Sequence, residues 1–490
     1  MRWIWTLPLL LALASVQGTP SSVLSPCTVP RFEGPALCGI YEVWEDREAR
    51  AGRRIPLKIV VLPATGPDRV PDPVFLLSGG PGQAATDLIP KASAELAEVR
   101  RRRDVVFIDQ RGTGGSNRLS CRVDEEEGYA GFGSSGGEGF IRRCRERLEK
   151  RADLGLYTTP LAVDDFDEVR AALGYEKVNL YGGSYGTRVG LVWLRRHPET
   201  VRSAVLVGVS PTDYRLPLFF ARAGQDALDR LFADCVADPA CKTAFPNVAE
   251  ELQAVLNRLA ARTVLVELPE KEGRPAQPIE LSRSSFAAQV HLLLFSAQMS
   301  SRLPFLIHRM FLEDYEPFAE IVAEFGAAVV DLIDFGMQLS VVCAEDIPFI
   351  TPEDVRSETA GTFLGAERVE PVIDTCRDWV RGKVPADYTA PVRSSVPTLL
   401  ISMELDPVTP PRFGEQAARH LSRSRHLVIP RASHLVDGAC MDGIIARSIE
   451  QGTADGVDAS CLEEFRRPPF VTSEKDNLPP ATSELPGRSG

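Results

Sequence analysis

The sequence predicts an α/β fold: a mostly parallel central sheet with flanking helices, and a helical cap inserted before the last two strands. Three observations lead to this prediction. Continuous apolar strands run into glycine-rich turns at 73–83 and 104–116, as expected of strands buried on both faces of a parallel sheet. From 211 to 389 the pattern changes to long amphipathic helices. Strand patterns then return at 396–411 and 426–438.

Before the buried strands, residues 41–46 and 57–62 are expected to form an antiparallel pair across a charged turn. Residues 121–150 are less regular, with cysteines at 121 and 144. We interpret them as a surface excursion tied at its base.

A helix is predicted over 158–177, with Thr159 as N-cap, Pro160 in the first turn and Gly174 at the stop. A further buried strand covers 203–211. Within the helical region, 317–337 is expected to form one helix.

The pattern divides the chain into five parts. They are a signal peptide (1–18), a first part of the α/β core (19–210), the helical cap (211–390), a C-terminal part of the core (391–468) and a disordered tail (469–490). The tail prediction rests on a composition rich in proline, serine and charge.

The chain has 490 residues, 44% of them apolar and 25% charged, which is an ordinary globular composition. Its length suits one large α/β domain with a sizeable insertion, or two domains. The net charge is −12, and the one basic run, 100–103, is short. This balance argues against nucleic acid as a partner.

The N-terminus predicts export. Arg2 precedes a short apolar stretch, 3–16, followed by small residues that allow cleavage after Gly18 or Ala14. The stretch is too short for a membrane span, so a secretory signal is favoured over an uncleaved anchor. No later apolar run could cross a bilayer, and we expect no stable membrane insertion after signal removal.

The ten cysteines are an even number, as expected of an exported protein with paired thiols. Sequential pairing is one of many possible connectivities, and it would give short local loops: Cys27–Cys38, Cys121–Cys144, Cys235–Cys241, Cys343–Cys376 and Cys440–Cys461. Neither C-x-x-C nor H-E-x-x-H occurs, so no metal or cofactor is predicted. The absence of N-x-[ST] sequons favours a secreted or periplasmic bacterial protein.

A nucleophile elbow is predicted around Ser184. A strand-like segment, 178–181, and a helix-like segment, 187–193, flank the sequence GGSYG, which fits G-x-S-x-G. Gly182 and Gly186 suit the turn because a Cβ at either place would clash. An incidental serine in a glycine-rich turn is the alternative, and the flanking strand and helix argue against it.

A serine hydroxyl needs a base, and the base needs an acid to orient it. Of six histidines, only His434 follows a final strand, in a loop from which it could reach Ser184. Asp406 follows the strand before it and begins a rigid DPVTPP turn; Asp437 and Glu404 are weaker candidates for the acid. Alone, each residue could be a loop histidine or a turn cap, but serine, acid and base in this order predict a catalytic triad.

The oxyanion formed on attack requires two N–H donors, worth about 3 kcal/mol each. We expect one from Tyr185, directly after the serine, and the other from Gly80, in the glycine-rich loop that follows the strand at 73–77. Pro81 has no N–H to offer.

The motifs SGGPGQ, DQRGTGGS, YGGSYGT and LDPVTPP, in this order, resemble the proline iminopeptidase and tripeptidyl aminopeptidase branch of the α/β-hydrolase serine peptidases. The resemblance covers about 40–465 and matches the family's nucleophile, acid and base to Ser184, Asp406 and His434. Two positions depart from the family: Ser78 stands where histidine is usual before GGPG, and the base lies in SHL rather than GHG.

The resemblance implies an exopeptidase, in which cap carboxylates hold the free ammonium group of the substrate. Glu345 and Asp346 are the best candidates, and Glu313, Asp314 and Glu316 are others. Solvated helix charges are the alternative for all five.

The sequence therefore predicts an exported serine aminopeptidase acting on peptides with a free N-terminus. A carboxylesterase or lipase of the same fold is the first alternative, since it would need no acids for an ammonium group. A catalytically silent binding protein is the second. Haloalkane dehalogenase and epoxide hydrolase chemistry is disfavoured, because those enzymes carry aspartate where Ser184 stands.

Overall fold

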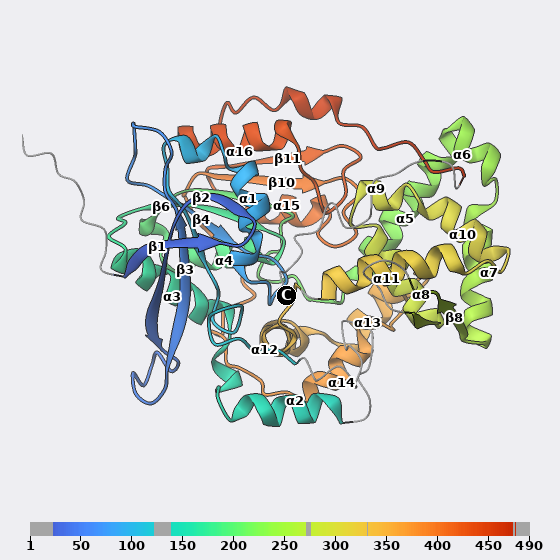
Figure 1. Cartoon of the computed structure of the whole chain (residues 1–490), viewed down its shortest axis with the longest axis horizontal. Coiled ribbons are helices and arrows are strands. Elements are labelled where there is room, and N and C mark those ends of the chain that lie inside the picture. The colour runs from blue at the N-terminus through green and yellow to red at the C-terminus, as the bar shows by residue number, and fades with distance from the viewer. Residues whose placement is uncertain (1–22, 122–138, 271–275, 331, 474–475, 477–490) are drawn as a thin grey trace, which may run out of the picture.

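The structure of the chain is a computed structural model that describes residues 23–121, 139–270, 276–330, 332–473 and 476 (Figure 1). The expected signal peptide and most of the expected tail lie outside these residues. Within them, no helix is long and apolar enough to cross a membrane.

One nine-stranded sheet organises the molecule, in the order β1-β2-β3-β5-β4-β6-β7-β10-β11. Its strands are β1 (Leu24–Val29), β2 (Phe32–Trp44), β3 (Arg54–Leu62), β4 (Val74–Leu77), β5 (Val105–Ile108), β6 (Val178–Gly183), β7 (Val201–Val207), β10 (Thr398–Met403) and β11 (Ser424–Ile429). Six neighbouring strands of the sheet pair in parallel: β5, β4, β6, β7, β10 and β11. The other three, β1, β2 and β3, form an antiparallel edge. The predicted fold class and the predicted antiparallel pair are confirmed.

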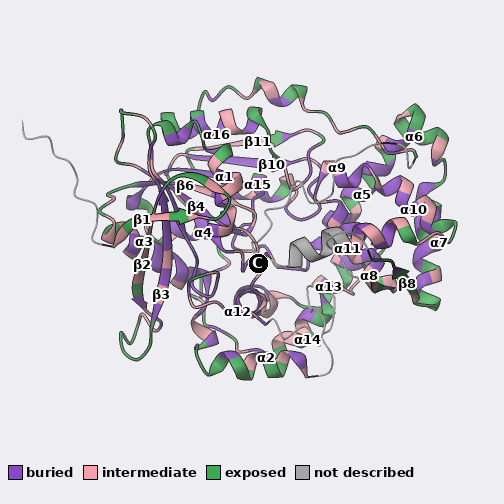
Figure 2. Cartoon of the chain, viewed as in Figure 1, coloured by how far each residue is buried: buried purple, intermediate pink, exposed green. Residues whose placement is uncertain are grey.

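Alternate residues of the central strands belong to two separate apolar layers, one on each face of the sheet, because successive side chains of a strand point to opposite faces. In β4, Val74 and Leu76 belong to one apolar cluster, while Phe75 and Leu77 belong to another. The first cluster is covered by α1 (Ile89–Glu95) and α16 (Ala439–Gln451); the second is covered by α2 (Phe140–Glu149), α3 (Thr159–Ala172), α4 (Tyr185–Arg196) and the end of α15 (Pro411–Ala418). Figure 2 shows buried residues running along the central strands between these helices.

The helix predicted over 158–177 is α3, which ends before Gly174, a glycine with φ +80°. The predicted N-cap is wrong by one residue: Thr158 holds that position, and its side chain makes no capping bond. Thr159 is the first helical residue, and its N–H donates to Glu345 Oε1 at 2.6 Å. A carboxylate from the helical region thus binds the helix N-terminus, where an anion is favoured by the unpaired amides.

In the sequence, the cap is inserted between β7 and β10, and in space it lies to one side of the sheet (Figure 1). It has an apolar core of its own. Its helices are α5 (Phe220–Ala237), α6 (Pro239–Ala244), α7 (Val248–Ala261), α8 (Arg283–Leu293), α9 (Ala297–Ser300), α10 (Leu303–Phe311), α11 (Glu316–Val330), α12 (Phe335–Glu345), α13 (Pro352–Thr359) and α14 (Glu370–Asp378). An antiparallel pair, β8 (Val264–Leu268) and β9 (Gln277–Leu281), was not predicted, although both strands alternate in burial. Short 3-10 turns are η1 (Ala85–Leu88), η2 (Val99–Arg101), η3 (Leu154–Leu156), η4 (Pro198–Thr200), η5 (Ile347–Phe349) and η6 (Ser460–Glu464).

The single helix predicted over 317–337 is wrong, because α11 ends at Val330 and α12 begins at Phe335. The side chains of α12 are buried along nearly its whole length. Met337, Leu339 and Val341 pack into the apolar cluster beneath the sheet, whereas Val342 packs into the cap. Helix α12 therefore joins the two regions, as its place between them in Figure 1 illustrates.

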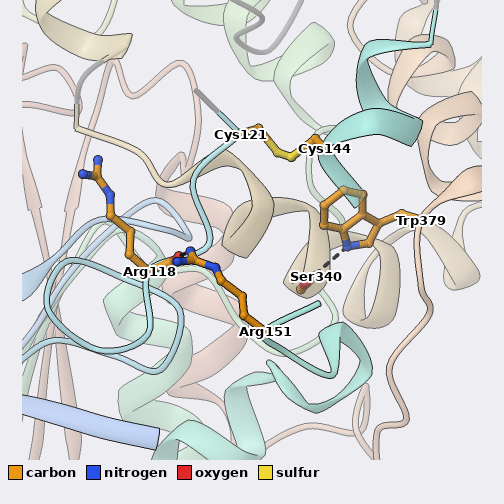
Figure 3. The surroundings of a disulfide bond; sticks show 6 residues. All are labelled: Arg118, Cys121, Cys144, Arg151, Ser340 and Trp379. Carbon is orange, nitrogen blue, oxygen red and sulfur yellow. Dashed lines mark hydrogen bonds between the residues drawn. A yellow bond between two sulfur atoms is a disulfide. The ribbon is translucent and has the colours of Figure 1, made fainter. Parts of the chain in front are cut away.

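Five disulfides pair the ten cysteines sequentially, which confirms the predicted connectivity. Figure 3 shows the Cys121–Cys144 bond, which attaches α2 to the chain that leaves the 109–118 loop. Close by, Trp379 Nε1 donates to Ser340 Oγ of α12 at 3.2 Å. The buried helix α12 is thus hydrogen-bonded to the chain that follows α14.

Candidate active site

Ser184 lies in a sharp turn between β6 and α4, with φ +54° and ψ −124°. A non-glycine residue with such a φ is strained, and strain of this kind is found at functional sites. The predicted need for glycine on either side is borne out: a Cβ on Gly182 would lie 2.6 Å from Gly186 O, and one on Gly186 would lie 2.0 Å from Leu77 O. The tight packing of this turn against β4 exposes the serine oxygen at the end of the sheet.

The structure brings the three predicted triad residues together. Ser184 Oγ lies 3.1 Å from His434 Nε2, and His434 Nδ1 lies 2.8 Å from Asp406 Oδ2. The residues follow β6, β10 and β11, whose parallel C-terminal ends share one edge of the sheet. The geometry is that of a nucleophile, a base and an orienting acid.

The turn after β10 holds the Asp406 carboxylate. The N–H groups of Val408 and Thr409 each donate to Oδ1 at 2.8 Å, and Thr409 Oγ1 donates to Oδ2 at 2.8 Å. Burial alone would raise the pKa of this carboxyl, but His434 and the donors from Thr409 outweigh burial, and the pKa lies below its ordinary value. Asp406 is therefore ionised and faces the imidazole. Sequence reasoning did not single out Thr409, although it stands in the quoted DPVTPP motif.

The other two candidate acids have different partners. Glu404 accepts from the Arg431 N–H at 2.8 Å and pairs with Arg230 at 3.1 Å. The Asp437 side chain is 64% exposed and lies 3.6 Å from Lys91. Of the three carboxylates, Asp406 is the one hydrogen-bonded to His434.

His291, which sequence reasoning did not single out, lies behind the acid. It is buried on α8, and its Nε2 is 3.0 Å from the carbonyl oxygen of Pro407. Burial lowers its pKa to about 3, so the ring is neutral and Nε2–H donates to that carbonyl. A cap helix thereby supports the turn that carries Asp406. Its helical setting resembles that of a core histidine, so no sequence signal marked it.

The two expected oxyanion donors line the same pocket as Ser184. Tyr185 begins α4, and Gly80 has φ +107° in the loop after β4. In the part of the chain that the structure describes, neither N–H donates to another protein group. The loop is closed by Ser78, whose Oγ donates to Gln83 O at 2.7 Å. Both amides are therefore free to bind a developing negative charge.

A pocket with a cavity volume of about 70 Å³, partly open to solvent, extends from Ser184 toward the cap. Cap residues and the turn after β10 give it an apolar wall: Tyr214, Leu216, Phe220, Phe295 and Val408. The ring of Phe295 also meets the imidazole of His434 edge-on, with centroids 5.3 Å apart. Such a pocket suits an apolar side chain on the acyl part of a substrate.

The two acids expected to bind an ammonium group lie one layer behind this pocket. Asp346 forms a two-point ion pair with Arg188, at 2.9 and 3.2 Å, and Arg188 itself lines the pocket. Glu345 accepts from Thr159 and from the Tyr388 hydroxyl and lies 3.7 Å from Arg188. Burial raises the pKa of both acids, and Arg188 opposes the increase. Their role toward a substrate stays a prediction.

The other three candidate acids, Glu313, Asp314 and Glu316, are exposed or partly exposed. The Glu313 side chain is 69% exposed, and Glu316 is exposed at the start of α11. Asp314 accepts from Arg309 Nε at 2.7 Å. The three acids do not line the pocket beside Ser184.

Comparison with known proteins agrees with this architecture. The family model described as alpha/beta hydrolase fold matches residues 72–436, and the chain belongs to that family. The serine protease Hip1 of Mycobacterium tuberculosis is 26% identical over 494 residues, which cover 91% of each chain. The tripeptidyl aminopeptidase of Streptomyces lividans is 30% identical over 191 residues, which cover 36% of this chain and 35% of that one.

Among solved structures, the proline iminopeptidase of Mycobacterium smegmatis matches with a TM-score of 0.40 and 18% identity, over 84% of this chain and 98% of that one. The predicted resemblance to this branch of the family is confirmed. These relatives support an enzyme of the hydrolase class, a serine peptidase of the α/β-hydrolase fold.

Proposed function

We propose that this chain is an exported serine aminopeptidase, similar to the proline iminopeptidases and tripeptidyl aminopeptidases, that hydrolyses peptide bonds near free N-termini. The observation that carries the proposal is the hydrogen-bonded series from Ser184 through His434 to Asp406, beside a pocket that cap residues line. Peptidases among the relatives support peptides as substrates.

In the acylation step, Ser184 Oγ attacks the carbonyl carbon of the scissile bond while His434 Nε2 takes the serine proton. The carbonyl oxygen becomes an oxyanion that the N–H groups of Gly80 and Tyr185 stabilise. The C–N bond then breaks, and His434 returns the proton to the leaving amine. The product is an ester between Ser184 and the N-terminal part of the substrate.

Deacylation repeats these steps with water as the nucleophile. His434 takes a proton from water as its oxygen attacks the ester carbonyl, and it protonates Ser184 Oγ when that ester bond breaks. Throughout, the Asp406 carboxylate holds the proton of the base on Nδ1 and stabilises the imidazolium form. The short N-terminal fragment leaves as a free acid.

Selection of a free N-terminus would come from the buried charges behind the pocket. When both acids are ionised, Glu345 and Asp346 together with Arg188 carry one excess negative charge. A substrate ammonium group in the pocket would offset that charge, and attraction between unlike charges is strong away from water. The acids act at one remove, because Arg188 lines the pocket and neither acid does.

Export is supported by the pairing of all ten cysteines in disulfides, which persist in oxidising compartments. We propose a periplasmic or secreted location. Secretion of the full-length chain with loss of residues 1–18, read by mass spectrometry of the mature N-terminus, would test it; an intact N-terminus in the cytoplasm would contradict it.

Activity is tested with a matched panel of chromogenic amides bearing one, two or three residues, each with a free and an acetylated N-terminus, and with nitrophenyl esters. We expect turnover of free amides, a large loss on acetylation, and no turnover by Ser184→Ala. Equal turnover of free and acetylated amides would refute N-terminal selection. Hydrolysis of esters alone would indicate a carboxylesterase, and absence of both turnover and fluorophosphonate labelling would indicate a binding protein.

The ammonium hypothesis is tested by Glu345→Gln and Asp346→Asn, with Glu313→Gln as the matched control at the cap surface. We expect both buried substitutions to raise KM for free amides relative to acetylated ones, because each removes negative charge behind the pocket. An unchanged ratio in two folded variants would contradict the role assigned to these acids.

A further inference from the structure

The position of Asp334 is that of an ordinary helix cap, but its side chain does something else. Asp334 is the N-cap residue of α12, with φ −80° and ψ 96°. Aspartate at this position normally accepts from the first-turn amides of its own helix. Here the side chain makes no capping bond. The fully buried carboxylate points instead to a different segment of the chain.

That segment is the loop after β5. Asp334 Oδ2 accepts from the Gly114 N–H at 3.0 Å, and Oδ1 accepts from Arg118 Nε. The same loop is tied to η1 through Asp109, whose carboxylate accepts from the Thr86 and Gly115 N–H groups, each at 2.9 Å. Asp334 thus binds the loop that supports the chain directly after the glycine-rich turn.

The backbone of Asp334 holds the glycine-rich turn itself. Its N–H donates to Gly82 O at 2.8 Å, and the preceding residue, Ile333, forms an antiparallel bridge with Gln83. The contact is close: Gly82 has φ +104°, and a Cβ there would lie 2.8 Å from Asp334 O. A Cβ on Gly80 would lie 3.3 Å from Ile333 Cδ1. Ile333 and Asp334 therefore cover the side of the turn that carries the expected oxyanion donor.

We propose that Asp334 is a positioning residue for the oxyanion site: it fixes the 79–83 loop by its backbone and the supporting 109–118 loop by its carboxylate. The inference rests on the proposed acyl transfer at Ser184, but not on the preference for free N-termini. The Gly80 N–H is effective only if it is held to within about 0.5 Å of the oxyanion position. Loss of the carboxylate would release the support for that amide while leaving Ser184, His434 and Asp406 in place.

A merely structural role would lower stability without a specific effect on the transition state. The measurement that separates the two roles is the affinity of a peptide boronic acid, whose boron bonds to Ser184 Oγ and becomes tetrahedral, with an oxygen in the oxyanion position. Weakened boronate binding that parallels lost kcat, at unchanged KM, indicates a poorly formed oxyanion site.

The experiment uses the full chain with Asp334→Asn and Asp334→Ala, each checked for folding by circular dichroism and thermal unfolding. We expect kcat to fall about 10-fold for the asparagine variant and about 100-fold for the alanine variant. The larger value is about the effect of losing one oxyanion donor altogether. Boronate affinity should fall by the same factors, while KM stays within about threefold. The partial function of asparagine, which keeps one acceptor oxygen, is the conservative rescue.

The matched control is Asp104→Asn. Asp104 also joins two segments, accepting from the Ala64 N–H and the Tyr175 hydroxyl. It directly precedes β5, however, and therefore lies at the N-terminal ends of the parallel strands, opposite Ser184. It should lose stability and keep kcat and boronate affinity. Folded Asp334 variants with wild-type kcat and boronate affinity, or an equal loss in the control, would overturn the inference. A wild-type chain that neither turns over any substrate nor binds the boronate would instead overturn the proposed function and this inference together.

Discussion

The α/β core and the cap bury their residues in different ways, and the difference separates the candidate triad from most of the pocket wall. In the core, each central strand sends alternate side chains to two covered faces, and the reactive groups stand where parallel strands end. In the cap, helices such as α7, α8 and α10 pack mainly on one another around a single cluster. Strand order alone places Ser184, Asp406 and His434. The cap supplies most of the pocket's apolar wall and the two buried acids behind it, Glu345 and Asp346.

Helix α12 and the residues on either side of it do not follow this division. They belong to the inserted region by sequence, yet they pack beneath the sheet, contact the glycine-rich turn and pair with Arg188 of α4. The boundary between core and cap in the sequence therefore differs from their boundary in space. The following predictions test it, from the largest expected effect to the smallest.

The strongest test asks whether catalysis depends on Asp406, the triad acid in the α/β core. Asp406→Asn should lower kcat on the order of 10⁴-fold, because an amide would favour the wrong tautomer of His434. Steady-state kinetics on a free-N-terminus amide measure the effect. Glu404→Gln, two residues away, is the control and should retain activity, since Glu404 binds Arg230 and Arg431. The reverse order of the two variants would refute the assignment.

A second test breaks the ion pair that joins core and cap. Arg188→Met should lower the free energy of unfolding by about 3–5 kcal/mol, since it leaves Glu345 and Asp346 buried without their cation. Burial already raises the pKa of both acids, so the folded state binds protons more tightly than the unfolded state. The loss should therefore grow as pH rises through the raised pKa values.

Urea unfolding at pH 5 and pH 8 measures that loss. The exposed pair Arg356 and Glu353 provides the comparison, and Arg356→Gln should change the free energy of unfolding by less than about 1 kcal/mol. A smaller loss for Arg188→Met at pH 8 than at pH 5 would contradict the stated sign.

A third test concerns His291, the cap residue behind the core acid. Its pKa is lowered to about 3, so the unfolded chain takes up a proton first as pH falls below about 6.5. Because of this proton uptake, the free energy of unfolding of the wild type should fall by about 2 kcal/mol between pH 6.5 and 5. The His291→Gln variant should not show this pH dependence. His420→Gln, at a partly exposed position, should keep the wild-type slope. Identical slopes for wild type and His291→Gln would refute a neutral, buried imidazole.

The smallest effect compares two disulfides. Cys343–Cys376 attaches α12 and spans 33 residues, while Cys235–Cys241 lies within the cap and spans 6. Loop entropy in the unfolded chain predicts that alanine replacement of the longer pair costs about 1.5 kcal/mol more. Denaturant unfolding of both double variants gives the difference; an equal or reversed cost would show that native packing, not chain entropy, dominates.

Much of the core could be predicted because its signals are local. Continuous apolar runs gave the strands, turn glycines gave the elbow, and chain order gave the three triad candidates that the fold brings into contact. The cap was harder, because helix α12 is buried on all sides and its period does not reveal its partners. The β8–β9 pair and the N-cap of α3 were missed for related reasons: short strands carry little pattern, and Thr159 bonds to Glu345 from another region.

By itself, the sequence determined the sheet, the serine in its glycine turn, and the order of acid and base, because each depends on residues close together in the chain or on strand order. The pairing of neighbouring cysteines was one of several possible connectivities until the structure was known. Only the tertiary structure decided which buried charges meet, that Asp334 turns away from its own helix, and that Arg188 lines the pocket while the two cap acids paired with it do not. A buried polar group must find a partner wherever the fold supplies one, and no local pattern specifies a partner hundreds of residues away.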